Sequence, residues 1–193
     1  MSQLDILKKD LDQLTKRIVF MAILTTELEK EGFSPVAGGN YAVELYTEGA
    51  FKSDAVEIFA PVDVLNKVLL PWGFDKVDGF LRHDEIGVTV RILGEGLNQN
   101  ELDRVNQVDV NGFPVYLMGV EDTITAKLKE FVHLHESDAI IWAQELIEIH
   151  VNEVDLDYLK ERATQEGAID PLRKLLLELR LEDEDEYEYG YYE

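Results

Sequence analysis

The chain has 193 residues, of which 46% are hydrophobic, 40 are acidic and 18 are basic, so that its net charge is −22. This apolar content excludes a wholly disordered chain, and the length allows one domain with a real core or a compact core with a helical annex. The acidic balance argues against a broad nucleic-acid-binding surface, because such surfaces rely on cationic contacts with phosphates. The absence of cysteine excludes disulfides, thiolate metal sites and a thiol nucleophile.

The chain also lacks the usual signals for export or membrane insertion. Its first residues, Met1 to Asp5, contain no basic segment followed by an apolar one. No apolar run approaches the roughly 18 residues that a membrane span needs. We therefore expect a cytoplasmic protein with no membrane partner.

The first part of the chain has an amphipathic pattern. Apolar residues recur there at steps of three and four, at Leu4, Leu7, Leu11, Leu14, Ile18, Met21 and Leu28. The pattern predicts a helix over residues 3–31, ended by Gly32. Its apolar stripe either packs on the protein's own core or pairs with a second subunit, and the sequence leaves both alternatives open.

The middle of the chain alternates between short strands and short helices. Residues 33–37 form a lead-in to Gly38-Gly39, and Asn111-Gly112 is the strongest hairpin signal. The predicted strands cover residues 53–59, 72–77, 80–83, 87–93, 107–110 and 113–117, and the predicted helices cover 40–47 and 62–70.

From Glu121 onward the pattern is helical. We predict four helices, at about 121–134, 137–150, 155–166 and 170–180, with Asp122 as the N-cap of the first. Residues 181–193 contain seven acids and no base, which is typical of a disordered acidic tail.

These elements predict an α+β fold: a mixed β-sheet with flanking helices, followed by a helical C-terminal part. The expected divisions are an N-terminal helix (1–31), an α/β core (32–118), a helical part (119–180) and the acidic tail (181–193).

Gly38-Gly39, at the start of a predicted helix, is the first motif with chemical meaning. Glycines at a helix N-terminus let backbone N–H groups approach a phosphate closely. Phosphoryl and nucleotidyl transfer also need carboxylates that hold Mg²⁺ against the phosphates. Two acids at i and i+2 on a strand point to one face and can share such metals.

The strand at 53–59 supplies only part of that carboxylate set. Val56 and Ile58 are its apolar residues and should face the core. Ala55, Glu57 and Phe59 then face the opposite side, so that one carboxylate lies on the candidate site's face.

Together these motifs resemble the nucleotidyltransferase-fold superfamily, in particular small bacterial relatives of the AbiEii toxin family. That group has a Gly-Gly helix start and a Thr-x-Asp-x-Asp strand. Residues 118–128 are similar to its Pro-Glu-Asp-Leu-Ile-x-x-Lys-Leu helix start, and the resemblance covers about residues 18–180. It implies a nucleotidyltransferase-like fold, a nucleotide ligand and, in an active protein, Mg²⁺.

Carried onto this chain, the family's metal acids are incomplete. The two acids of its strand fall on Ala55 and Glu57, and its third acid falls on Arg91. Asp54 is out of phase unless a bulge turns it, while Asp84 lies in a predicted turn upstream of Arg91. The candidate catalytic residues are therefore Glu57 and Asp54, and the candidate metal ligands are Glu57, Asp54 and Asp84.

The resemblance also implies a set of nucleotide-binding residues, namely Gly38, Gly39, Ser53, Arg91 and Lys127. Each has a structural alternative. The glycines can form an ordinary tight turn, the serine can simply open the strand, Arg91 can pair with Glu57, and Lys127 can belong to a solvated helix face.

The sequence therefore favours a nucleotidyltransferase-fold protein with a degenerate site and a nucleotide-binding, regulatory or scaffold role. Its partner would be a second copy or another protein, as in a toxin–antitoxin-like assembly. The alternative is an active Mg²⁺-dependent nucleotidyltransferase that transfers a nucleotide from an NTP to an unknown acceptor. Mg²⁺ is the expected cofactor only in that alternative.

Overall fold

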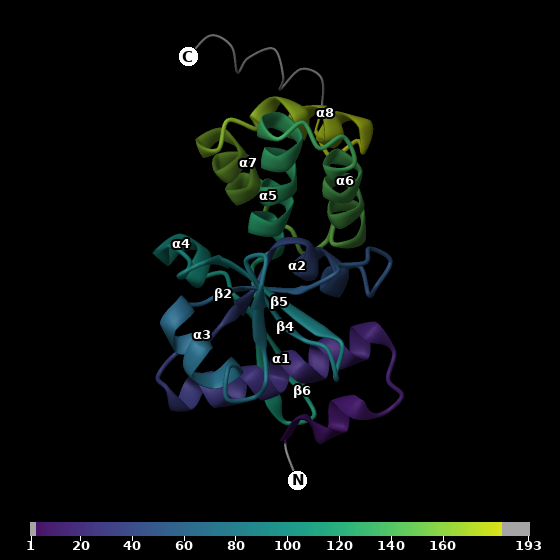
Figure 1. Ribbon diagram of the computed structural model, residues 1–193. Coiled ribbons are helices and arrows are strands. Elements are labelled where there is room, and N and C mark those ends of the chain that lie inside the picture. The colour runs from purple at the N-terminus through teal and green to yellow at the C-terminus, as the bar shows by residue number, and fades with distance from the viewer. Residues whose placement is uncertain (1–2, 183–193) are drawn as a thin grey trace. The chain divides into compact units, whose positions relative to one another are not determined.

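The computed structural model describes residues 3–182, so most of the predicted acidic tail lies outside the described residues (Figure 1). The chain divides between Gly119 and Val120 into two compact units. The first contains the β-sheet and the second consists of helices. Within the described range, no helix is both long and apolar enough to span a membrane.

The N-terminal segment forms two helices, so the prediction of one helix over 3–31 is wrong. A 3₁₀ helix, η1 (Gln3–Lys8), precedes the α-helix α1 (Gln13–Lys30). Asp12 separates them because its carboxylate caps α1, accepting a hydrogen bond from the backbone N–H of Thr15 at 2.9 Å.

Four of the seven residues of the predicted apolar stripe pack on the protein's own core, while Leu11, Leu14 and Ile18 are only partly buried. Leu4 and Leu7 of η1, and Met21 and Leu28 of α1, are buried members of the main hydrophobic cluster. The face of α1 next to this stripe, which includes Val19 and Ile23, is only partly buried. This neighbouring face of α1 is therefore partly accessible to solvent.

The sheet of the first unit has seven strands in the order β3-β4-β5-β2-β1-β7-β6. The pairs β2–β5 and β1–β7 are parallel and the other pairs are antiparallel. The strands are β1 (Val36–Ala37), β2 (Val56–Phe59), β3 (Asp75–Val77), β4 (Phe80–His83), β5 (Val88–Gly94), β6 (Asn106–Val110) and β7 (Phe113–Leu117).

β1 corrects the prediction of a lead-in at 33–37. It is a central strand, with β2 on one side and β7 on the other. With only two residues it is too short to show the alternation by which strands are recognised in sequence. The predicted Asn111-Gly112 hairpin is confirmed, since both residues have positive φ, 55° and 86°, and join β6 to β7.

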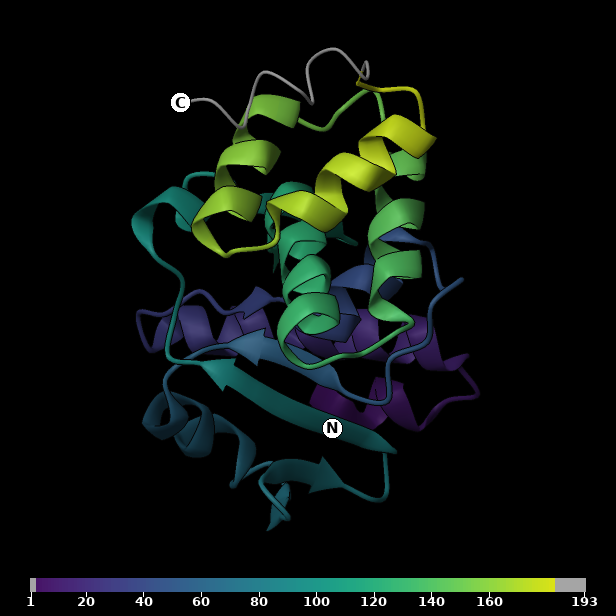
Figure 2. The ribbon, with the colours of Figure 1, turned by 90° about the horizontal axis from the view of Figure 1, so that it is seen from above.

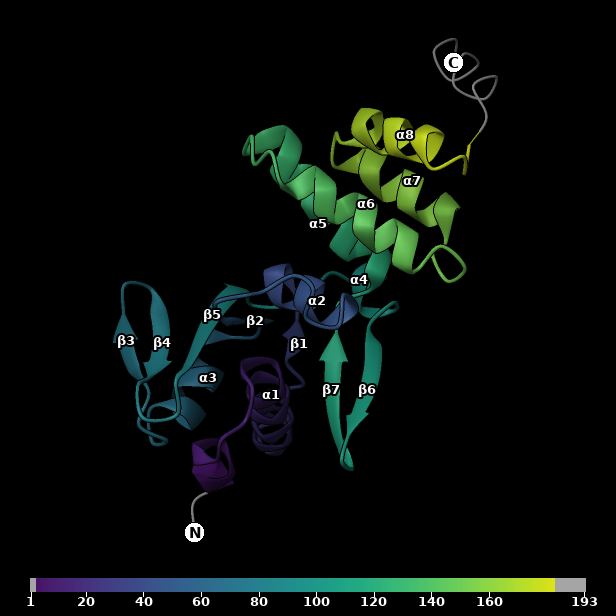
Figure 3. The same cartoon turned by 90° about the vertical axis from the view of Figure 1, so that its right-hand side faces the viewer.

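Helices α1 and α3 (Val62–Leu69) contact each other and contribute to one core with the sheet (Figure 3). Leu65 and Leu69 of α3 share this core with Val56 and Ile58 of β2. Two shorter helices complete the unit, α2 (Gly39–Tyr46) after β1 and α4 (Gln99–Leu102) after β5. The opposite face of β2, which carries Glu57 and Phe59, does not belong to this core.

The second unit confirms the four predicted C-terminal helices, with ends shifted by one or two residues. They are α5 (Val120–His133), α6 (Ala139–Ile149), α7 (Leu156–Gln165) and α8 (Ile169–Glu178), green to yellow in Figure 2. α5 contacts both α6 and α7, and α7 also contacts α8.

Asp122 ties this unit together, and its predicted role as a helix N-cap is wrong. It is the third residue of α5, and its buried carboxylate accepts a hydrogen bond from Nε of Arg162 at 2.9 Å. The hydroxyl of Tyr158 donates to the same carboxylate at 3.2 Å. The carboxylate therefore links α5 to α7 and does not cap its own helix.

Candidate functional site

Gly38 and Gly39 lie where β1 ends and α2 begins. The N–H of Gly38 donates to the carbonyl of Glu57 at 3.0 Å, and the carbonyl of Gly38 accepts from the N–H of Ala42 at 3.0 Å. Gly39, the first residue of α2, has φ +55°, a conformation that disfavours side chains with a Cβ.

Both glycines allow side chains of β2 to approach the backbone. A Cβ on Gly38 would lie 2.6 Å from Cε2 of Phe59, and a Cβ on Gly39 would overlap Oε2 of Glu57. Glu57 and Phe59 thus share one side of β2, while Val56 and Ile58 lie in the hydrophobic cluster. This confirms the predicted phase of the strand.

Glu57 is buried, with its side chain 5% exposed, and both of its carboxylate oxygens are engaged. Oε2 accepts a hydrogen bond from the backbone N–H of Asn40 at 2.5 Å. Oε1 accepts one from Nη1 of Arg91 at 3.1 Å. Glu57 and Arg91 are also register partners in the parallel β2–β5 pair. The carboxylate is therefore held by a helix N-terminus and by a cation.

The position of this carboxylate matters because anions bind at helix N-termini through the same groups. The free N–H groups and the helix dipole favour negative charge there. The Glu57 carboxylate uses the N–H of Asn40, which is the second residue of α2. The chain thus supplies its own anion at the helix start that follows the glycine pair.

The residues around Glu57 do not fit a Mg²⁺ ion. Magnesium takes a near-octahedral set of oxygen ligands. Here the residue opposite Glu57 is a guanidinium, 53% exposed, and Ala55 has no side-chain oxygen. Across residues 3–182, no three histidine, aspartate or glutamate side chains are grouped so that they could hold a metal ion.

Ser53 and Asp54 precede β2, and the predicted strand start at residue 53 is wrong. The Ser53 hydroxyl donates to the carbonyl of Ala55 at 2.8 Å, a local bond that holds the segment as a turn before Val56. Both residues line a separate cavity of about 520 Å³. The side chains of Arg17 and Glu44, which form a bidentate ion pair, lie in the wall of that cavity.

Asp84 and Lys127 have their own partners. Asp84 is exposed in the turn after β4 and pairs with Nε of Arg82 at 2.6 Å. Lys127 belongs to α5 in the second unit, where its buried amine pairs with Glu130 at 2.6 Å. Of the predicted site residues, the structure brings Gly38, Gly39, Glu57 and Arg91 into contact.

Sequence reasoning missed one participant, Asn40, and it placed Phe59 on the correct face without giving it a role. Asn40 acts through its backbone N–H, so its side-chain type gives no signal, although its place directly after the glycine pair does. Phe59 packs on Gly38 and accounts for the first glycine of the pair.

Solved structures with a similar fold belong to nucleotidyltransferase-like proteins. One is an antigenic nucleotidyltransferase-like protein from Paracoccidioides brasiliensis, with 16% identity, a TM-score of 0.53, and 86% of this chain and 92% of that chain covered. Two others are structures of ANT(2″)-Ia. Its complex with adenylyl-2″-tobramycin has 11% identity, a TM-score of 0.54 and coverages of 79% and 97%. The antibiotic-resistance factor in solution has 13% identity, a TM-score of 0.55 and coverages of 86% and 97%.

No protein-family model and no curated protein sequence matches the chain. The similarity at this identity lies in the fold, which is a nucleotidyltransferase-like α+β fold with a mixed sheet and C-terminal helices.

Proposed function

We propose that this chain is a nucleotidyltransferase-fold protein that does not transfer nucleotides and acts instead as a regulatory or scaffold protein. In this proposal the Glu57–Arg91 ion pair replaces the centre where an enzyme of this fold would hold metal and phosphate. The finer form of the proposal, a partner in a toxin–antitoxin-like assembly, rests on the sequence resemblance to relatives of the AbiEii family.

The observation that carries the proposal is the state of Glu57. Its two oxygens are bonded to the N–H of Asn40 and to the guanidinium of Arg91. A metal at Glu57 would have to displace Arg91 and would then sit beside that cation. A phosphate at the start of α2 would have to displace the carboxylate of Glu57.

The glycine pair is also accounted for without a nucleotide. Gly38 makes room for the Phe59 ring and Gly39 makes room for the Glu57 carboxylate. The motif that suggested a phosphate cradle thus has a packing role inside the first unit.

The experiment that tests the proposal combines thermal unfolding with a transfer assay. The protein is heated with each of the four NTPs, with and without Mg²⁺ or Mn²⁺, and is incubated with α-³²P-labelled NTPs and its own lysate proteins and RNA. We expect no metal-dependent rise in melting temperature and no labelled product. ANT(2″)-Ia with tobramycin serves as the positive control for the assay.

The opposite outcome would support the alternative of an active enzyme. It consists of a Mg²⁺-dependent rise in melting temperature together with labelling that is lost in Glu57→Gln. A rise with NTP alone that disappears in Arg91→Gln would instead support metal-independent nucleotide binding, because Arg91 is the exposed cation of the pair.

A further inference from the structure

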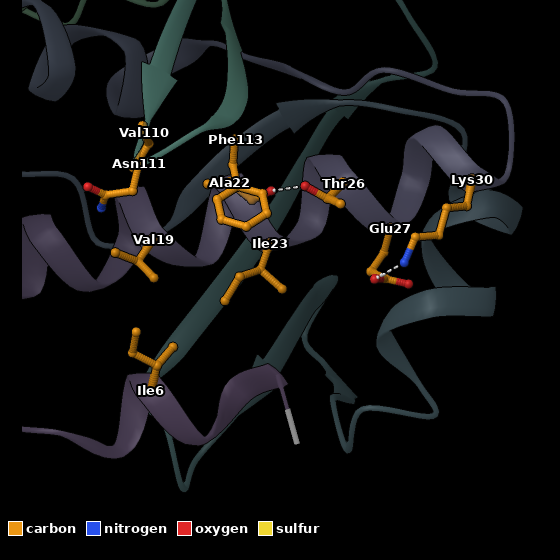
Figure 4. A pocket seen from close by; sticks show the side chains of 10 residues that line it. All are labelled: Ile6, Val19, Ala22, Ile23, Thr26, Glu27, Lys30, Val110, Asn111 and Phe113. Atoms are coloured by element: carbon orange, nitrogen blue, oxygen red, sulfur yellow. Dashed lines mark hydrogen bonds and ion pairs between the residues drawn. The ribbon is translucent and has the colours of Figure 1, made fainter. Parts of the chain in front are cut away.

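The first unit has a groove whose lining does not include Glu57 or Arg91, so what we infer from it does not depend on the proposed function. The groove lies between η1, α1 and the tip of the β6–β7 hairpin and has a volume of about 410 Å³ (Figure 4). We name it the apolar groove. Six of its ten lining residues are apolar: Ile6, Val19, Ala22, Ile23, Val110 and Phe113.

Large apolar side chains project from the edges of the apolar groove. Ile6 on η1 is 43% exposed and Phe113 on the hairpin is 46% exposed. Val108, on the edge strand β6, is 47% exposed. It pairs in register with Val115 and is two residues from Val110, so it lies on the same side of the sheet as both. Exposed apolar side chains grouped beside a hollow are typical of an interaction site.

The charge around the apolar groove indicates what covers it. Among the described residues that line the groove, the charged ones are Glu27 and Lys30, which pair with each other at 2.5 Å. Residues 3–31, which form η1 and α1, have six acids and five bases, and residues 106–117 of the hairpin have one acid. These two segments therefore carry −2 of the total −22, which leaves −20 on the rest of the chain.

This distribution distinguishes a second copy from a basic partner. A basic partner would be drawn to the strongly acidic parts of the chain. A second copy carries the same net charge of −22 and would be repelled by those parts. The two segments that line the apolar groove carry only −2, so a contact made through them brings two such copies together at a low electrostatic cost.

The apolar groove also combines a hollow with exposed apolar side chains, the two parts that a two-fold interface requires. In such an interface the same surface of each subunit supplies both the hollow and the side chains that fill it. Here the hollow lies beside Ile6 and Phe113, which project from its two sides. We propose that the apolar groove packs against the same groove of a second copy, forming a symmetric homodimer.

This interface differs from the seam that the sequence pattern suggested. Leu4, Leu7 and Leu28 of that stripe are buried in the protein's own core. The proposed contact uses the next face of α1, at Val19 and Ile23.

The test measures mass in solution by light scattering after size exclusion, over a range of protein concentrations. We expect wild type to approach twice the chain mass of 22.1 kDa. Phe113→Asp and Ile6→Asp should each weaken dimerisation at least tenfold. Phe80→Asp is the matched control, because Phe80 is 36% exposed on β4 and does not line the groove.

Cross-linking provides a second readout. Because the chain has no cysteine, an introduced thiol is the only one that can react. Thr26→Cys places a single thiol in the groove, and a bismaleimide should then link two copies. Thr164→Cys on α7 is the control and should stay unlinked. Both hydroxyls donate to the carbonyl four residues earlier in their own helix, so the two substitutions remove the same kind of bond.

Three results would overturn the proposal. The first is a wild type that stays monomeric at all concentrations. The second is a dimer that persists in both groove variants, with circular dichroism used to select the variant that remains folded. The third is a monomer that binds a hydrophobic dye and loses it in Phe113→Asp, which would assign the groove to an apolar ligand.

Discussion

Gly39 and Glu57 are in such close contact that a Cβ at residue 39 would overlap Oε2 of the Glu57 carboxylate. The contact joins the start of α2 to the face of β2 that points away from the hydrophobic cluster. It lets the carboxylate reach the N–H of Asn40. The glycine and the acid are therefore parts of one arrangement, and the first prediction separates their contributions.

Gly39→Ala should destabilise the first unit by about 3 kcal/mol. Positive φ costs a residue with a Cβ roughly 1–2 kcal/mol, and the overlap with Glu57 adds a similar amount, as overpacking typically does. Gly87→Ala is the matched control, because Gly87 has φ +64° and its Cβ would meet nothing within 4 Å. It should cost only the first of these terms.

Urea unfolding measures both variants in a Trp142→Phe background. The chain has two tryptophans, and this change leaves Trp72 as the reporter of the first unit. Adding Glu57→Ala to Gly39→Ala should recover part of the loss. Equal costs for the two glycine variants would contradict a role for the Glu57 contact.

The Glu57–Arg91 pair should show measurable coupling in a double-mutant cycle. Glu57→Gln and Arg91→Gln, singly and together, should give a coupling free energy of about 1–2 kcal/mol, because one partner is buried. The exposed Arg82–Asp84 pair is the internal control and should give less than about 1 kcal/mol. Similar values for the two pairs would mean that burial of Glu57 adds nothing.

Arg91→Asp should create a cation site beside Glu57. The change places a carboxylate opposite Glu57 on the neighbouring parallel strand, where like charges repel until a divalent ion binds. Mn²⁺ at about 100 times its Kd would add about 2.7 kcal/mol of stability, which thermal unfolding detects. Arg91→Ala is the control; a variant whose melting temperature ignores Mn²⁺ would show that the strand geometry cannot hold metal.

Glu166 should make the second unit's stability depend on acid pH. The hydrogen bond from Lys129 lowers the pKa of Glu166 below its ordinary value of 4.5. Because the folded pKa is lower than the unfolded one, the contribution is fully present above about pH 4.5. It is lost as the pH falls through the folded pKa.

Glu166→Gln should therefore cost up to about 1 kcal/mol at pH 7 and nothing at the acid end of the titration. Urea unfolding between pH 7 and pH 3 in a Trp72→Phe background checks this, with Trp142 reporting the second unit. Lys129→Gln should flatten the same region of the profile. A pH-independent difference between wild type and Glu166→Gln would refute the assignment.

Asp122 should be the most costly polar residue to remove from the second unit. Asp122→Ala removes the nearer carboxylate partner of the buried Arg162 guanidinium, which keeps Gln165 at 2.9 Å and Glu166 at 3.5 Å, and should cost about 3 kcal/mol. Tyr158→Phe removes only one neutral donor and should cost about 1 kcal/mol. The same Trp142 reporter measures both, and a loss for Asp122→Ala no larger than that for Tyr158→Phe would contradict this role.

The parts of the fold that follow local patterns could be predicted from sequence. The four C-terminal helices, the Asn111-Gly112 hairpin and β5 each have a periodicity or a turn signal of their own. The break before α1 was missed because the apolar period continues through Leu11. Asp12 nevertheless caps the N-terminus of α1, so that a new helix begins there. β1 was missed because its two residues are defined by their neighbours in the sheet.

The candidate site divides in the same way. The alternation of β2 sufficed to place Glu57 and Phe59 on one face. The family resemblance placed Arg91 near Glu57, and the two are register partners. Sequence could not show that Glu57 reaches Asn40, because that bond depends on how closely β2 approaches the start of α2. Nor could it show that Asp54 lines a separate cavity and that Asp84 pairs with Arg82.

The packing of Phe59 and Glu57 against the glycine pair has a consequence for recognising such proteins. Replacing either glycine would disturb the first unit whether or not the protein binds a nucleotide. A Gly-Gly helix start can thus be required by packing alone, and by itself it does not identify an activity. The proposed function depends instead on Arg91, the register partner of Glu57 on the neighbouring strand.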